Sequence, residues 1–150
     1  MAEYVSVPEQ AVALNSPVIF TASIPCTKGY VYHEDETGIF ILRGIVNCPT
    51  ACFARYEVTF NGNIALPTGG TAGPIALAIT ESGETIPASL AIVTPAAVDE
   101  YFNVTCTATI TVPRGCCFTV AVRHVASDPA ETPAPTINVQ NATFRVKRVA

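Results

Sequence analysis

The stretch FNVTCTATITV, residues 102–112, decides the fold class because its side chains alternate between two kinds without a break. Apolar residues occupy every even position from Phe102 to Val112, and asparagine or threonine occupies every odd position from Asn103 to Thr111. Successive side chains of a β-strand point to opposite faces of the sheet. The stretch therefore predicts a half-buried strand, with one face on a core and one in solvent.

Similar patterns recur along the rest of the chain. Alternating or short apolar segments predict strands at 16–24, 38–46, 54–60, 75–81, 84–90, 117–125 and 137–149. Between them, clusters of glycine, proline and asparagine predict turns at 61–63, 67–74 and 127–135, and Ser82-Gly83 predicts a hairpin turn between two short strands. Many short strands separated by such turns predict an all-β sandwich or barrel, and a jelly-roll β-sandwich suits a chain of 150 residues.

The composition limits the classes of partner. Hydrophobic residues make up 49% of the chain and charged residues 13%, whereas a soluble domain has about 25% charged residues. We therefore expect an oligomer that covers apolar surface. A net charge of −4 without a basic run argues against nucleic acid as a partner. No apolar segment approaches the roughly 20 residues of a membrane span, and residues 1–15 do not have the pattern of a secretory signal.

The order of these segments resembles the TNF-like and complement-subunit-like jelly-roll superfamily. The segments that carry the resemblance are NSPVIFTASI (15–24), GIFILRGIVN (38–47), ARYEVTFNGN (54–63), TITVPRGCCFTVAV (109–122) and NATFRVKRVA (141–150). They are similar to the family's opening strand, the next strand, a strand that leads into a hairpin at Asn61-Gly62, the penultimate hairpin, and a closing strand in the middle of a sheet. The chain resembles the bacterial and phage members most, such as the terminal domains of collagen-like exosporium proteins, although no Gly-X-Y stalk precedes it.

The resemblance implies a TNF-like jelly-roll domain over residues 14–150, assembled as a compact homotrimer with a structural or surface role. Residues 1–13 are then expected to form an N-terminal extension or docking arm. Members of the family bury an apolar sheet face around the threefold axis. Tyr56, Phe60, Phe118 and Phe144 are therefore the candidates for the trimer core or interface.

Six cysteines, at 26, 48, 52, 106, 116 and 117, allow packing, disulfides or a metal site. A zinc site needs four convergent ligands, and the adjacent Cys116 and Cys117 would point to opposite faces of a strand. The spacing favours packing, with Cys106 as a buried free thiol and the adjacent pair packed beside a turn. Cys48 and Cys52 are the best candidates for a disulfide.

Few other residues suggest chemistry. The acidic turn from His33 to Thr37 contains three carboxylates that could hold a divalent cation, but a solvated turn is favoured. His124 is expected at the surface or in an interface. Neither a Gly-x-Ser-x-Gly nucleophile motif nor a phosphate-binding glycine loop occurs. We therefore predict no catalytic, cofactor or metal-binding residues, and a protein that is not an enzyme.

Our leading hypothesis is a structural trimer that decorates the capsid of a bacteriophage, with a capsid protein as partner and the virion surface as location. One alternative is a trimer that binds a carbohydrate or a host surface through the loops 67–74 and 127–135. Another is a component of a bacterial spore coat, exosporium or cell surface.

Overall fold

The computed structural model describes residues 2–24, 30–33, 36–46, 50, 52–70, 73–126 and 136–149. Within these ranges the chain forms twelve strands and one short 3-10 helix. Their bounds are β1 (Ala2–Ser6), β2 (Gln10–Ala13), β3 (Ala22–Ile24), β4 (Val31–His33), β5 (Phe40–Arg43), β6 (Phe53–Ala65), β7 (Ile75–Glu81), β8 (Glu84–Thr85), η1 (Pro87–Ser89), β9 (Ala91–Val93), β10 (Phe102–Pro113), β11 (Cys117–Val125) and β12 (Thr136–Arg148).

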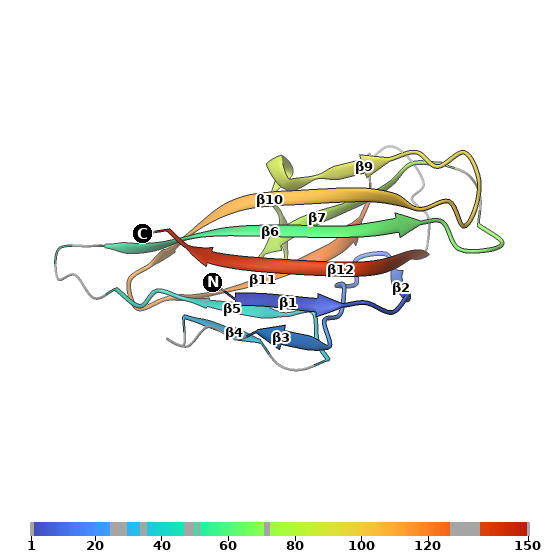
Figure 1. The fold of residues 1–150 in the computed structure, drawn as a ribbon. Helices are drawn as coiled ribbons and strands as arrows, with labels where there is room; N and C mark the ends of the chain where they lie inside the picture. The colour runs from blue at the N-terminus through green and yellow to red at the C-terminus, as the bar shows by residue number, and fades with distance from the viewer. Residues whose placement is uncertain are drawn as a thin grey trace.

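The strands form two antiparallel sheets packed face to face (Figure 1). Sheet A has the order β10-β6-β12-β1-β3, and β2 also pairs with β12. Sheet B has the order β4-β5-β11-β7-β8, and β9 also pairs with β7. The predicted all-β sandwich is confirmed, and the closing strand β12 lies inside sheet A as the resemblance implied.

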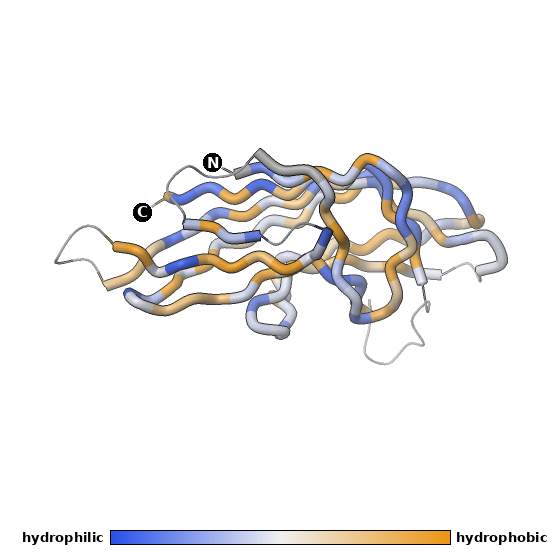
Figure 2. Tube along the Cα trace, turned by 90° about the horizontal axis from the view of Figure 1, so that it is seen from below, coloured by the Kyte–Doolittle hydropathy of each residue, from blue (hydrophilic) through white to orange (hydrophobic). Residues whose placement is uncertain are grey.

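The alternation of side chains accounts for the core. In β10 the side chains from Val104 to Val112 at even positions are buried, and those from Asn103 to Thr111 at odd positions are exposed. The same alternation continues along β6, and Figure 2 shows it as changing colour along the strands. Each sheet thus buries one face against the other, as the sequence predicted.

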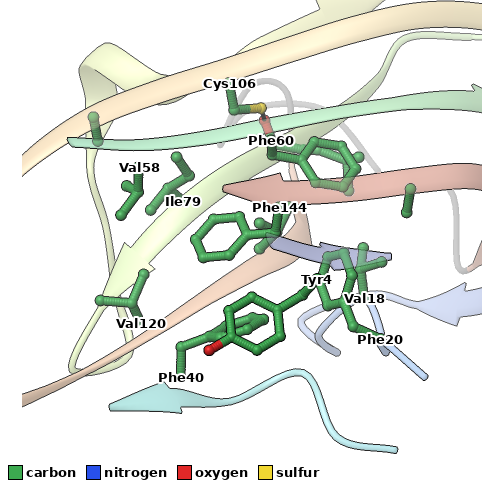
Figure 3. Packing of buried hydrophobic residues seen from close by; sticks show 14 of the residues in the cluster. Tyr4, Val18, Phe20, Phe40, Val58, Phe60, Ile79, Cys106, Val120 and Phe144 are labelled. Carbon is green, nitrogen blue, oxygen red and sulfur yellow. Dashed lines mark hydrogen bonds between the residues drawn. The ribbon is translucent and has the colours of Figure 1, made fainter. Parts of the chain in front are cut away.

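Aromatic rings fill the space between the sheets (Figure 3). The ring of Phe40 in β5 lies 4.6 Å from that of Tyr4 in β1 and 4.5 Å from that of Phe144 in β12, measured between centroids. Phe20 lies 5.5 Å from Phe40 and 6.4 Å from Phe60. Tilted and edge-to-face contacts of this kind are the arrangements that aromatic side chains prefer. They join sheet A to sheet B across the core.

Tyr56 adds a polar link between the sheets. Tyr56 belongs to β6 and its ring is buried on the inner face of that strand. Its hydroxyl donates a hydrogen bond of 2.5 Å to the backbone carbonyl of Arg43 in β5. The guanidinium of Arg148 lies 4.2 Å from the centroid of Tyr30 and 5.9 Å from that of Tyr56. These contacts close the sandwich at the end where β12 finishes.

The N-terminal residues belong to the sandwich, so the expected boundary between an arm and a domain at residues 13 and 14 is wrong. β1 pairs with β12 on one side and with β3 on the other, and β2 extends the same edge of β12. Tyr4 and Val12 are buried in the core. The apolar side chains of the first residues are therefore part of the folded domain and do not form a separate arm.

The predicted turn at Asn61-Gly62-Asn63 is also wrong, because β6 continues through it to Ala65. The two asparagines lie on the outer face of the sheet, where they hydrogen-bond to Asn103 of β10. Gly62 lies where a β-carbon would come within 2.8 Å of the Phe60 ring. Glycine here serves close packing, and the turn follows at 67–70, where the Gly70 amide donates to the Pro67 carbonyl.

The turn at 113–116 does not join two strands of one hairpin, as the resemblance had suggested. It carries the chain from β10 in sheet A to β11 in sheet B. Gly115 has a φ of +80°, which glycine adopts without strain, and the Cys116 amide donates to the Pro113 carbonyl over 3.0 Å. The predicted turn at Ser82-Gly83 is confirmed, because both residues have positive φ and connect β7 to β8.

Of the strand predicted over 16–24, only the last three residues form a regular strand, β3. Pro17 and Phe20 instead make single bridges to Arg123 and Thr37. A proline offers no amide hydrogen to a strand ladder, so this segment leaves sheet B after a few residues and crosses to sheet A.

His124 is buried in β11, so its expected place at the surface is wrong. Its Nδ1 lies 3.2 Å from the Val12 carbonyl, which can only accept, so Nδ1 carries the hydrogen. Burial away from water lowers the pKa of His124, although hydrogen bonds to the carbonyls of Val12 and Ala13 oppose the shift. The imidazole is therefore neutral near pH 7 and ties β11 to β2.

We predict that Tyr56→Phe lowers the free energy of unfolding by about 1 kcal/mol, because it removes the hydrogen bond to the Arg43 carbonyl. The measurement is urea denaturation followed by circular dichroism. Tyr32→Phe is the matched control, since this tyrosine is 49% exposed and its change is expected to stay within about 0.5 kcal/mol. Equal effects of the two changes would contradict the assigned role of Tyr56.

Deletion of residues 2–13 is expected to abolish cooperative unfolding, because it removes two strands from sheet A and two core side chains. Near-ultraviolet circular dichroism and a thermal melt measure the effect. Val7→Ser in the same segment is the control, since Val7 is 61% exposed and should tolerate the change. A folded deletion variant with a sharp transition would show that β1 and β2 are dispensable.

The free energy of unfolding is expected to fall as the pH is lowered below about 6.5, the ordinary pKa of histidine. The unfolded chain then binds a proton that buried His124 does not, at a slope of at most about 1.4 kcal/mol per pH unit. His124→Asn keeps a donor near the Val12 carbonyl but does not titrate. Urea midpoints at pH 7.5 and 5.0 should therefore differ less in the variant, and an unchanged difference would exclude His124 as the cause.

Candidate functional site

The aromatic residues predicted for the trimer core or interface lie in the core of the single chain. Tyr56, Phe60 and Phe144 are 0% exposed in the single chain, so they have no surface left to bury against another copy. Phe118 is half-buried and packs against the same core. Tyr56, Phe60 and Phe144 therefore belong to the interior of the sandwich, which was one of the two places expected for them, and not to an interface. Alternation along a strand separates inside from outside but does not distinguish a core from an oligomer interface.

The outer face of sheet A is a regular surface, which we call the polar face. Thr107 of β10 lies opposite Thr59 of β6, and Arg145 of β12 lies on the other side of Thr59. The side chains of this face include Glu3, Val5, Phe53, Arg55, Glu57, Thr59, Asn61, Asn63, Asn103, Thr105, Thr107, Thr109, Thr111, Asn138, Gln140, Thr143, Arg145 and Lys147. Most of them are uncharged and carry hydroxyl or amide groups.

Three asparagines organise one part of the polar face. Asn61 Nδ2 donates to Thr105 Oγ1 over 2.9 Å and to Asn103 Oδ1 over 3.3 Å. Asn103 Nδ2 donates in return to Asn61 Oδ1 and Asn63 Oδ1, both over 3.1 Å. Because these bonds join β6 to β10, they hold the amide groups in fixed positions on the sheet.

A shallow open groove of about 300 Å³ lies beside this network, lined by Thr59, Asn61, Thr105, Thr143 and Arg145. Arg145 Nε lies 3.5 Å from the Glu3 carboxylate, an ion pair near the surface. The groove thus offers hydroxyl and amide groups for hydrogen bonds, and the positive charge of Arg145 is compensated by Glu3. It can bind a polar surface, and its side chains include neither a histidine nor a cysteine to act as base or nucleophile.

The cysteines fall into two groups. Cys106 is a buried free thiol, as predicted, and burial raises its pKa to about 12. Cys52 is a free and exposed thiol, and Cys48 lies outside the described residues, so the disulfide between them stays a prediction. Cys116 and Cys117 are exposed, which corrects the expectation that they pack, because the 113–116 turn extends beyond the core.

The acidic turn is described only in part. Glu34 and Asp35 lie outside the described residues, so the cation-binding hypothesis stays untested. The His33 ring stacks on Phe40 at 4.5 Å, and its Nε2 donates to the Thr37 carbonyl over 2.8 Å. In the described part of the chain, no three histidine, cysteine or carboxylate side chains are close enough together to hold a metal ion.

The loops predicted to bind a carbohydrate are also mostly beyond the described ranges, since 71–72 and 127–135 are not included. At the same end of the sandwich, Tyr101 donates a hydrogen bond to the Glu9 carboxylate. Burial and this carboxylate raise the pKa of Tyr101 to about 12. Among the described residues, no helix has the length and apolarity needed to cross a membrane.

The sequence contains one signal for the polar face, in addition to the alternation that predicted the strand. The run of threonines at 105, 107, 109 and 111 identifies a strand face that is polar but uncharged. An ordinary solvated strand face carries lysine or glutamate at many such positions. This row therefore marks the outer face of β10 as a polar and uncharged surface.

No protein-family model and no characterised protein sequence matches the chain. Among solved structures, it is similar to the globular domain of the zebrafish complement 1qA protein, with a TM-score of 0.64 and 13% sequence identity. The match covers 99% of this chain and 97% of that chain. An identity this low shows the fold alone. The protein therefore has a jelly-roll sandwich of the TNF-like and C1q-like type, as predicted from the sequence.

Proposed function

We propose that the protein is a non-enzymatic structural module that forms a homotrimer through the polar face of sheet A and coats or decorates a larger assembly. The fold supports this, because C1q-like globular domains commonly form homotrimers and are a non-enzymatic fold. The virion surface of a bacteriophage, with a capsid protein as partner, stays the predicted setting. Spore or cell surfaces and a carbohydrate-binding role stay the alternatives.

The observation that carries the proposal is the uncharged row of side chains that β10 contributes to the polar face. Burying an ionised side chain in an interface costs several kcal/mol unless it is paired, whereas hydroxyl and amide groups need only hydrogen-bond partners. Along β10 the exposed side chains from Asn103 to Thr111 are all asparagine or threonine. A strand face of this kind can be covered by another copy at low electrostatic cost.

The asparagine network supports the same conclusion. Asn61 and Asn103 already satisfy much of each other's hydrogen-bonding capacity within the chain. Since their amides are held in place before association, less side-chain entropy is lost when a second copy covers them. The face is therefore ordered in advance for a polar contact.

The proposal predicts a mass near three times 15.8 kDa by light scattering after size exclusion, unchanged by a reductant. Thr107→Arg, on the edge strand β10 of the polar face, should convert the trimer to a monomer, because three like charges would be buried without partners. Thr119→Arg, at an exposed position of β11 in sheet B, is the matched control and should leave the mass unchanged.

A monomer of 15.8 kDa for the unchanged chain would overturn the trimer. Loss of the trimer in both arginine variants would instead contradict the choice of the polar face. The surface role has a separate test: the protein should sediment with the virions or cell envelopes of its source. Recovery in the soluble fraction alone would contradict that role and leave the trimer standing.

A further inference from the structure

Three exposed thiols gather at one end of the sandwich. Cys52, Cys116 and Cys117, which we call the thiol end, are free and exposed, whereas the other described cysteine, Cys106, is buried. A free cysteine is among the residues most often buried in proteins. Three exposed ones together therefore need an explanation other than packing.

Backbone hydrogen bonds bring these residues to the same end. The Arg114 amide donates to the Cys52 carbonyl over 2.9 Å, which places the start of β6 beside the 113–116 turn. The Gly44 amide donates to the Cys116 carbonyl over 2.8 Å, which places the end of β5 beside the same turn. β11 begins at Cys117, the next residue.

Two of the thiols lie opposite an arginine. Cys117 is paired with Arg43 on the neighbouring strand β5, and both are exposed on the outer face of sheet B. At the end of β10, Pro113 pairs with Phe53 of β6. The next residue, Arg114, is also exposed and therefore lies opposite Cys52. Directly opposed residues have β-carbons about 5 Å apart, so each thiol shares its part of the surface with an arginine side chain.

We propose that the thiol end is a reaction site for anionic low-molecular-weight disulfides, which form mixed disulfides at Cys117 and Cys52. The thiol loses its proton to water, and the thiolate sulfur attacks one sulfur of the reagent. A new S–S bond forms, the S–S bond of the reagent breaks, and the departing sulfur keeps the electron pair as a thiolate. The protein thiol is oxidised and one half of the reagent is reduced. Arg43 and Arg114 attract the carboxylates of the reagent.

The same geometry disfavours other uses of these thiols. A symmetric disulfide between two copies would bring like-charged arginines together at the contact. A disulfide between the adjacent Cys116 and Cys117 would join α-carbons about 3.8 Å apart, below the usual range of about 4.4–6.8 Å. Cys106 is excluded by its burial, since the reacting sulfur must be accessible.

The test compares one exposed thiol at a time. One variant retains Cys117 and another retains Cys52, with the remaining cysteines changed to serine except buried Cys106. Each reacts with dithiobisnitrobenzoate, which is dianionic, and with dithiodipyridine, which is neutral, and absorbance gives both rate constants. The ratio of the rate constant with the anionic reagent to that with the neutral reagent measures how strongly the arginine attracts the charged reagent. Differences in the exposure of the two thiols cancel in this ratio.

Arg43→Gln is expected to lower this ratio about threefold at Cys117 and to leave it unchanged at Cys52, as one charge at about 6 Å in water predicts. Arg114→Gln should have the reverse effect. Arg43→Lys keeps the charge and should keep the ratio, and added salt should reduce the ratio in the parent chain. With glutathione disulfide, mass spectrometry should show one adduct on each single-thiol variant.

The proposal would be overturned if neither arginine variant changes the ratio of the anionic to the neutral rate constant. It would also be overturned if this ratio is the same in the folded chain and in the chain unfolded in urea. Covalent dimers in place of the glutathione adduct would also overturn it and identify a contact between copies instead. Near-ultraviolet circular dichroism of every variant confirms that the rates come from a folded chain. The result is independent of the homotrimer, whose mass is measured separately.

Discussion

The contacts between aromatic rings across the two sheets are the interaction on which the rest of the structure depends. Phe40 of sheet B packs against Tyr4 and Phe144 of sheet A, and Phe20 lies between Phe40 and Phe60. Each ring comes from a different part of the chain, so the cluster fixes β1, β5, β6 and β12 relative to one another. Large aromatic side chains bury much apolar area each, which suits a domain that uses no disulfide among its described residues.

This interior has a consequence for the surface. Since the large aromatic residues are used between the sheets, the outer face of sheet A is left with threonine, asparagine and a few charged residues. An oligomer built on such a face would depend on hydrogen bonds and shape more than on apolar burial. The outer face of sheet A is therefore polar, and is not the apolar surface that the low charge content of the chain led us to expect.

The two groups of thiols show the same separation of inside from outside. Cys106 is on the inner face of β10 and behaves as a small apolar residue, with its sulfur 3.6 Å from the Leu77 carbonyl. Cys117 has the outward position on β11, next to Thr119, which is also exposed. Identical side chains thus have different chemistry because one lies between the sheets and the other beyond them.

The sequence by itself determined the all-β class, the strand β10 with its two faces, the turn at Ser82-Gly83 and the burial of Cys106. These features depend on local patterns, namely alternation with period two and residues that adopt positive φ. Only the tertiary structure decided that residues 2–13 pair inside sheet A, that β6 continues through Asn61-Gly62-Asn63, and that Arg43 and Arg114 lie opposite cysteines. Those outcomes depend on which strands become neighbours, and pairing between distant segments leaves no periodic signal in either segment alone.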